Sequence, residues 1–230
     1  MSHLLLLHGA LGTPAYFDFI KDALQNVYTI HAPAFEGHAM EPLTKSPLRL
    51  SHYVDQISHY MDTHQLSAVD VFGYSMGGYV ALALAQQFPQ RIRKVMTLAT
   101  KYAWTPDVAN KESRMLQPDS IQQKVPAFAT QLMQTHGENQ WASLVKEVAG
   151  MLMDLGEHAL LHKDSMQNIQ AKVQVMVGDK DAMVSIDETR QLAADLPQAY
   201  LAVLPNTIHP FEKINQELLL SHLHVFLNTP

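Results

Sequence analysis

The sequence predicts an α/β fold in which about six mostly parallel strands form one sheet, with helices on both faces and an inserted helical cap. Three observations predict it. Short apolar runs alternate with longer segments of helical periodicity, which is typical of a parallel sheet. This alternation stops between residues 99 and 173, where the chain reads mainly as helix. The 230 residues, 47% hydrophobic and 17% charged, suffice for one folded core.

Each expected strand is a short run of mainly apolar residues bounded by turn-forming or polar residues. The six runs lie at residues 3–7, 27–31, 68–72, 95–99, 173–177 and 200–204. Pro33 closes the second run, and the third leads directly into a glycine-rich turn. Leu4 to Leu7 is apolar at every position, which predicts a strand buried on both faces.

The expected helices fill the spaces between the strands and show apolar residues at helical spacing. They lie at residues 15–25, 50–64, 75–88, 186–196 and 210–227. Tyr53, Ile57 and Met61 share one face of the second helix, and Pro89 ends the third. The spacing of Phe211, Ile214 and the apolar residues that follow predicts one continuous last helix.

Residues 101–170 are expected to form a helical cap inserted into a core made of residues 1–100 and 171–230. Turn breaks near Pro106, Pro118, Pro126 and Gly137 divide the segment, and it holds more apolar residues than a plain connection needs. Some of these residues are therefore expected to face the core or a substrate. No repeat, low-complexity tract or Gly/Ser linker indicates a second independent domain.

Composition excludes several classes of function. A net charge of −6 and the lack of any Lys/Arg run make nucleic acid an unfavourable partner. The absence of cysteine excludes disulfides, a cysteine nucleophile and thiolate metal sites. The apolar run at Leu4 to Leu7 is too short for a signal sequence or a membrane span. We therefore expect a cytoplasmic protein that acts on a small molecule.

Ser75 is the expected nucleophile, within Gly73-Tyr74-Ser75-Met76-Gly77. The motif follows an expected strand and opens an expected helix, which is the context in which a G-x-S-x-G turn presents a serine hydroxyl above a sheet. The two flanking glycines suit the close approach of backbone at such a sharp turn. A serine hydroxyl is a weak nucleophile, so a base and a group that orients the base are also required.

The sequence resembles the α/β-hydrolase fold family through landmarks that follow the strands in the family's order. These are His8-Gly9-Ala10 after the first strand, residues 73–78 after the third, Gly178-Asp179-Lys180-Asp181 after the fifth, and His209 after the sixth. The resemblance covers essentially the whole chain, although the cap is matched only by position and helical character. One departure lies at residues 34–39, where Gly37 and His38 match the family loop but its aspartate is missing.

The resemblance implies a catalytic triad of Ser75, Asp181 and His209, in the order this fold uses. Asp181 stands three residues after Gly178 and would orient the imidazole of His209. Asp179 is the competing carboxylate, with a turn-forming role as its alternative. His209 is distinguished from the other histidines by its position in a loop between the last strand and the last helix.

The oxyanion hole is expected to use two backbone N–H groups. One should come from Met76, directly after the nucleophile. By resemblance the other comes from Ala10, with its neighbour Leu11 as the alternative. His8 is expected to brace this loop, although its ring could also border the pocket.

For two other groups of residues, the sequence gives a weaker indication of a function. His158 and His162 stand four residues apart on an expected cap helix, a spacing that can bind zinc, but no H-E-x-x-H motif is present. We interpret these two histidines as part of a solvated helical face and expect no bound metal. Residues 151–153, Met-Leu-Met, could either grip an acyl chain or pack in the core.

We therefore expect a serine hydrolase, most simply a carboxylic ester hydrolase, that cleaves a small hydrophobic ester or thioester through an acyl-enzyme intermediate without a cofactor. An alternative is a C–C bond hydrolase or lyase of the meta-cleavage-product hydrolase or menaquinone-synthesis type. Arg114 is the only arginine within residues 101–170, which disfavours a dicarboxylate substrate. A ligand-binding module without turnover is the alternative from a different class. No sequence feature indicates an oligomeric state.

Overall fold

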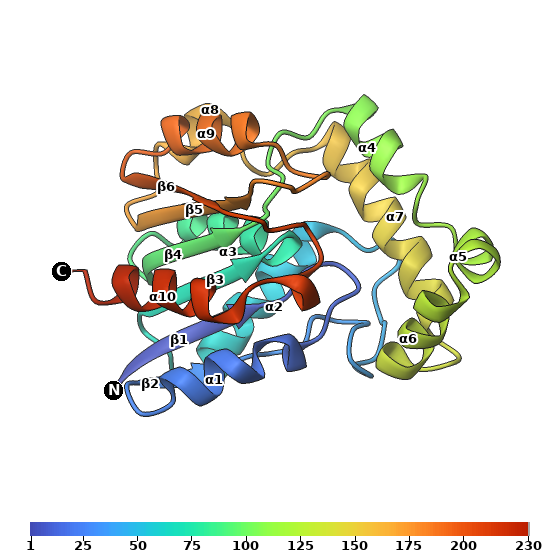
Figure 1. Ribbon diagram of the computed structural model, residues 1–230, viewed down its shortest axis with the longest axis horizontal. Coiled ribbons are helices and arrows are strands. Elements are labelled where there is room, and N and C mark those ends of the chain that lie inside the picture. Colours follow the sequence, from blue (N-terminus) through green and yellow to red (C-terminus); the bar gives the residue numbers. More distant parts are fainter. Residues whose placement is uncertain (230) are drawn as a thin grey trace.

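A six-stranded sheet runs through the centre of the protein in the computed structural model, which describes residues 1–229 (Figure 1). The strands are β1 (Ser2–Leu7), β2 (Tyr28–His31), β3 (Val69–Tyr74), β4 (Ile92–Leu98), β5 (Lys172–Gly178) and β6 (Ala199–Leu204). They are ordered β2-β1-β3-β4-β5-β6, and every neighbouring pair is parallel. The predicted α/β fold with six parallel strands is confirmed.

Strand β1 shows why the sheet needs helices on both sides. Its four consecutive leucines are fully buried, and alternate side chains of a strand point to opposite faces. Leu5 and Leu7 pack in the core on one face, whereas Leu4 and Leu6 pack in the core on the other. A strand of this kind is stable only where both faces are covered.

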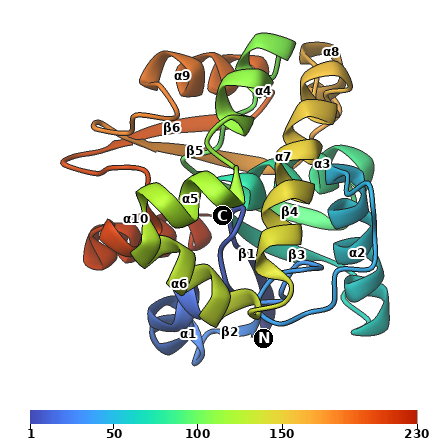
Figure 2. The same ribbon diagram turned by 90° about the vertical axis from the view of Figure 1, so that its right-hand side faces the viewer.

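Two layers of helices supply this cover. Helices α1 (Asp18–Leu24) and α10 (Gln216–Leu227) pack on the face of Leu4 and Leu6. Helices α2 (Leu50–Thr63), α3 (Met76–Gln87) and α9 (Ile186–Asp195) pack on the opposite face. The views in Figures 1 and 2 show these layers on either side of the sheet.

Four helices that follow β4 form a separate layer beside the carboxyl ends of the strands (Figures 1 and 2). They are α4 (Pro106–Ser113), α5 (Pro118–Lys124), α6 (Pro126–His136) and α7 (Trp141–Glu157). A short helix, α8 (Lys163–Met166), precedes β5 and lies outside this layer, where Lys163 pairs with Asp195 at the end of α9 (Figure 1). Proline stands in the first turn of α4, α5 and α6, where its missing N–H needs no partner.

Side chains from this layer hold the loop between β2 and α2. Gln140 accepts a hydrogen bond from the Leu43 N–H at 3.1 Å and donates to the carbonyls of Gly37 and Glu41. Glu147 accepts from the Leu48 N–H at 2.8 Å. The loop lacks regular structure of its own, so these contacts satisfy backbone groups that would otherwise be left without partners.

Two predicted helices are divided in the structure. The segment expected as one helix from Pro210 contains a short 3₁₀ helix, η2 (Phe211–Lys213), and then a break, so that prediction is wrong for its first turn and a half. Ile214 is extended, and the Asn215 side chain accepts a hydrogen bond from the Leu218 N–H, which starts α10 afresh. The 15–25 helix likewise begins with a 3₁₀ helix, η1 (Pro14–Phe17).

Within residues 1–229, none of the helices is both long enough and apolar enough to cross a membrane.

Candidate active site

Ser75 stands at the turn between β3 and α3, at the carboxyl edge of the sheet. Its backbone has φ 51° and ψ −118°, a left-handed conformation that is strained for a residue with a side chain. The Ser75 N–H donates to the Leu98 carbonyl at 2.8 Å, and its carbonyl accepts from Gly78 N–H and Thr100 Oγ1. These bonds hold the strained turn and fix the direction of the Ser75 hydroxyl.

The turn is possible because backbone segments approach one another closely at two glycines. A Cβ on Gly77 would lie 2.1 Å from the Leu7 carbonyl oxygen, and a Cβ on Gly73 would lie 2.4 Å from the Gly77 carbonyl oxygen. Both distances are far inside van der Waals contact. The start of α3 can therefore pack directly against the ends of β1 and β3.

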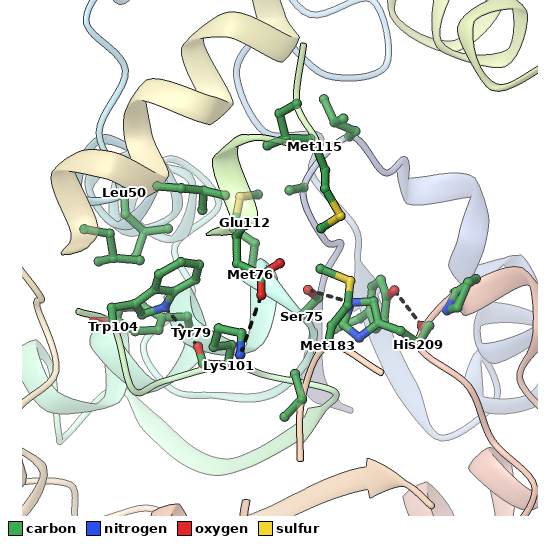
Figure 3. A pocket seen from close by; sticks show the side chains of 18 of the residues that line it. Leu50, Ser75, Met76, Tyr79, Lys101, Trp104, Glu112, Met115, Met183 and His209 are labelled. Atoms are coloured by element: carbon green, nitrogen blue, oxygen red, sulfur yellow. Dashed lines mark hydrogen bonds and ion pairs between the residues drawn. The ribbon is translucent and has the colours of Figure 1, made fainter. Parts of the chain in front are cut away.

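The structure brings Ser75, His209 and Asp181 together in one hydrogen-bonded row. Ser75 Oγ lies 3.3 Å from His209 Nε2 (Figure 3), and His209 Nδ1 lies 2.8 Å from Asp181 Oδ2. A carboxylate can only accept, so Nδ1 carries the proton and Nε2 presents its lone pair to the serine hydroxyl. This is the protonation state that a general base requires.

Asp181 is held in its charged form by its surroundings. Its side chain is 1% exposed, and this burial alone would raise the pKa of the carboxyl. The hydrogen bond from His209 and the N–H groups of Met183 and Val184, at 2.8 and 2.9 Å from Oδ1, outweigh the burial and lower the pKa. Asp179 instead accepts from the Thr207 N–H at 3.0 Å and braces the loop that carries His209.

Two backbone N–H groups beside Ser75 are free to bind an oxyanion. Within the described residues 1–229, neither the Ala10 nor the Met76 amide donates to a protein acceptor, and both residues line the same cavity as Ser75. Met76 is the first residue of α3, where amides have no intrahelical partner. The Leu11 amide, by contrast, donates to His38 Nε2 at 3.0 Å and is already engaged.

Three buried histidines hold the loop that carries Ala10. His38 binds the Leu11 N–H, and His136 on α6 donates from Nε2 to the Leu11 carbonyl at 3.0 Å. His8 contacts the Gly9 carbonyl through Nδ1 and accepts from the Phe35 N–H through Nε2. His8 therefore braces this loop, and it does not line the cavity. Leu11 itself has φ 55°, so the loop is held in a conformation that needs such support.

Burial keeps these imidazoles neutral. It lowers the pKa of His8 to about 4, holds the pKa of His38 well below its ordinary value and also lowers the pKa of His136. Each ring accepts a backbone N–H at one nitrogen, so a second ring proton would have to displace that bond. The loop position of His38 was predictable from the sequence, but its contact with Leu11 and the role of His136 were not.

A cavity of about 370 Å³ opens over Ser75 and is mainly apolar. Its lining comes from both the core and the segment that holds α4–α7. The apolar part includes Leu11, Leu50, Met76, Trp104, Met115, Leu116, Phe128, Leu152, Leu155 and Val184. Of the Met-Leu-Met stretch, Met151 is buried in the core, Leu152 lines the cavity and Met153 is 36% exposed, so only Leu152 is placed to contact a ligand.

Three charged residues in the cavity wall were not identified from the sequence: Lys101, Glu112 and Glu212. Lys101 follows β4, and Glu112 lies on α4; their charged atoms are 4.0 Å apart (Figure 3). A signal for Lys101 was present, since it follows the end of a buried parallel strand, where functional side chains collect. Glu112 gave no such signal because its direction depends on how α4 packs.

The histidine pair at 158 and 162 does not share a helix, contrary to the prediction. Helix α7 ends at Glu157, and His162 caps the start of α8. His158 instead contacts Asp154 at 3.2 Å on the surface. In the described part of the chain, no group of three or more histidine and acidic side chains is placed to hold a metal ion.

Two of the known proteins with similar sequences match this chain over part of their length. The chain is 33% identical over 91 residues to the dihydrolipoyllysine-residue acetyltransferase component of an acetoin cleaving system from Cupriavidus necator, covering 40% of this chain and 24% of that protein. It is 28% identical over 125 residues to a pimeloyl-[acyl-carrier protein] methyl ester esterase from Neisseria meningitidis, covering 54% of this chain and 38% of that protein. The matched stretches thus span well under half of these relatives.

The fold is matched over almost its full length. The enol-lactonase from Burkholderia xenovorans superimposes with a TM-score of 0.81 at 16% identity, covering 99% of this chain and 92% of that chain. A family model described as alpha/beta hydrolase fold matches residues 2–155, about two thirds of the chain. The strand order, the turn at Ser75 and this match agree, and the chain belongs to the α/β-hydrolase fold family.

Proposed function

We propose that the protein is a serine hydrolase that cleaves a small, largely hydrophobic carboxylic ester or thioester through an acyl-enzyme intermediate. The observation that carries this proposal is the row of hydrogen bonds from Ser75 through His209 to Asp181, which opens into an apolar cavity. The esterase and lactonase among the similar proteins act on carboxylic esters according to their names, which supports the same reaction type.

Acylation begins when Ser75 Oγ attacks the carbonyl carbon of the ester. The hydroxyl proton passes to His209 Nε2, and the Asp181 carboxylate stabilises the imidazolium that results. The carbonyl oxygen becomes an oxyanion, which the N–H groups of Ala10 and Met76 bind. Collapse of this intermediate breaks the bond to the leaving group, which takes the proton from His209 and departs as an alcohol or thiol.

Deacylation repeats these steps with water as the nucleophile. His209 removes a proton from the water, whose oxygen attacks the acyl carbon of the Ser75 ester. The second oxyanion occupies the same pair of N–H groups. Its collapse returns the proton to Ser75 Oγ and releases the acid, so the cycle closes without a cofactor.

We infer that residues 101–170 act as a cap over a core of residues 1–100 and 171–230. This segment supplies apolar residues to the cavity, including Met115, Phe128 and Leu152. A cavity of about 370 Å³ lies at the small end of the range for ligand sites, which suits a short or medium acyl chain.

The geometry supports the other two functions less well. A C–C bond hydrolase for dicarboxylates would need cationic groups to bind the acid. Arg114 is exposed and does not line the cavity, and Lys101, which does line it, is already paired with Glu112 and Glu188. A binding module without turnover would have no need for an imidazole within 3.3 Å of a strained serine.

The test is covalent labelling with a fluorophosphonate, followed by peptide mapping. We expect one phosphonylated residue, Ser75, in the wild type and none in Ser75→Ala. p-Nitrophenyl esters from acetate to long acyl chains should be hydrolysed with a maximum at a short or medium length, because the cavity is bounded. Folded wild-type protein that is not labelled, or that hydrolyses esters as fast as Ser75→Ala, would rule out the serine hydrolase.

A further inference from the structure

A buried carboxylate in the cavity wall has no hydrogen-bond partner. Glu112 is 6% exposed, lines the same cavity as Ser75, and its Oε2 atom makes no hydrogen bond in the structure. Its other oxygen, Oε1, lies 4.0 Å from Lys101 Nζ, which is an ion pair but too long for a hydrogen bond. A carboxylate removed from water without hydrogen bonds is strongly unfavourable, so its presence calls for an explanation.

Lys101 does not neutralise Glu112 by itself, because a second carboxylate competes for it. Glu188 Oε2 is closer to Lys101 Nζ, at 3.4 Å. Glu188 is also satisfied elsewhere, since its Oε1 accepts from the N–H groups of Tyr102 and Ala103. The cluster therefore holds one positive and two negative groups, and Glu112 is the one of the two carboxylates that lines the cavity.

The packing of α4 fixes the direction of Glu112 but provides no hydrogen-bond partner for its Oε2 atom. Helix α4 lies against α7 through Ala109 and Gly156, where a Cβ on the glycine would come within 2.6 Å of the Ala109 Cβ. This close contact of small residues fixes the two helices. Figure 3 shows Glu112 projecting from α4 into the pocket near Lys101, on the side away from His209.

We propose that Glu112 accepts a hydrogen bond from a hydroxyl or ammonium group of the substrate. A donor is required because a carboxylate can only accept, and the excess negative charge of the cluster favours a donor over an acid. Ser75 and Glu112 line the same mainly apolar cavity, which suits a substrate whose ester and donor group are joined by hydrocarbon. The substrate class is then a hydroxy or amino ester.

This inference rests on the proposed function only for placing the ester at Ser75, so its test uses binding to the Ser75→Ala protein. Calorimetric titration compares ethyl esters of about four to eight carbons that end in methyl, hydroxyl, ammonium or carboxylate. At the best length we expect the hydroxyl or ammonium ester to bind about tenfold more tightly than the methyl ester, and the carboxylate ester more weakly than both. Comparing the affinities of the hydroxyl esters with those of the ammonium esters shows which of the two donors Glu112 prefers.

Glu112→Leu in the Ser75→Ala background should abolish the preference and tighten binding of the methyl-terminated ester. Glu112→Gln keeps an acceptor but removes the charge, so it should weaken the ammonium series more than the hydroxyl series. Glu138→Gln is the matched control, because Glu138 is exposed and does not line the cavity. If Glu112→Leu does not fold, the inference is tested by the affinities of Glu112→Gln and by the comparison of the ester end groups.

Equal binding of methyl- and donor-terminated esters at every length would overturn the inference, as would a preference that persists in Glu112→Leu. Undetectable binding of every donor-terminated ester counts against it too. Failure of the hydrolase proposal would appear separately, as absence of fluorophosphonate labelling in the wild type. The binding comparison in Ser75→Ala does not depend on hydrolysis and could still be interpreted.

Discussion

At the scale of single residues, the two aspartates of the loop after β5 have different tasks. Asp181 contacts His209 at 2.8 Å, whereas Asp179 contacts the backbone of Thr207 at 3.0 Å. The first contact determines which imidazole nitrogen carries a proton. The second determines only the shape of the loop.

Asp181→Asn should therefore lower kcat by roughly 10³–10⁴, because an amide can donate to Nδ1 and leave the proton on Nε2, which then cannot accept from Ser75. Asp179→Asn keeps an oxygen for the Thr207 N–H and should keep kcat within about tenfold. Steady-state hydrolysis of p-nitrophenyl acetate measures both. A larger loss in Asp179→Asn than in Asp181→Asn would reverse the two assignments.

Residue patterns predicted Ser75, Asp181 and His209 because the chemistry of each lies in a short segment after a strand. They did not predict Glu112 or His136. The contact between His136 and Leu11 joins positions 125 residues apart, and the direction of Glu112 depends on how α4 packs on α7. Such contacts depend on tertiary packing, so a short stretch of sequence does not predict them.

At the scale of elements, the junction of β3 and α3 depends on close backbone packing. A side chain on Gly77 would meet the Leu7 carbonyl carbon at 2.5 Å and its oxygen at 2.1 Å, and neither group is free to move within the sheet. Gly150 on α7 offers the opposite case, since nothing lies within 4 Å of a Cβ placed there.

Gly77→Ala should lower the free energy of unfolding by at least about 3 kcal/mol and remove the ester hydrolysis that we propose. Gly150→Ala, the matched control, should raise the free energy of unfolding by about 0.5–1 kcal/mol because alanine favours the helix. Urea unfolding followed by circular dichroism compares the two. Similar changes in both variants would show that the close approach at Gly77 does not limit the fold.

The pattern of elements was predictable where apolar residues formed a continuous run, as in β1, or recurred at helical spacing, as in α2. It was not predictable at residues 210–215, where the apolar spacing continues but Asn215 offers its side chain to the Leu218 N–H and starts a new helix. A hydrogen bond of this kind competes with helix continuation without altering the apolar pattern.

At the scale of the whole molecule, the buried histidines make folding sensitive to acid. The pKa of His8 is lowered from 6.5 to about 4 in the folded protein, mainly by burial. Between these two values the unfolded chain binds a proton that the folded chain does not. The free energy of unfolding therefore falls as the pH drops from about 6.5 to 4, and this contribution levels off once both states are protonated.

For His8 alone, this loss is on the order of 3 kcal/mol. Urea unfolding measured at intervals from pH 7.5 to 4 should show a shallower slope for His8→Gln than for the wild type. His59→Gln, at an exposed position, is the control and should follow the wild-type slope. Parallel curves for His8→Gln and wild type would show that His8 does not couple protons to folding.

The bond from His136 to the Leu11 carbonyl also limits how this protein can be recombined. Exchange of residues 101–170 for the corresponding segment of a family member is an obvious route to a new specificity, since the segment supplies much of the cavity wall. The graft would also remove His136 and Gln140, which hold the loops at Leu11 and Leu43. A chimera should keep both side chains. Without them, the exchanged segment would alter the cavity wall and would also leave the loops at Leu11 and Leu43 without their hydrogen bonds.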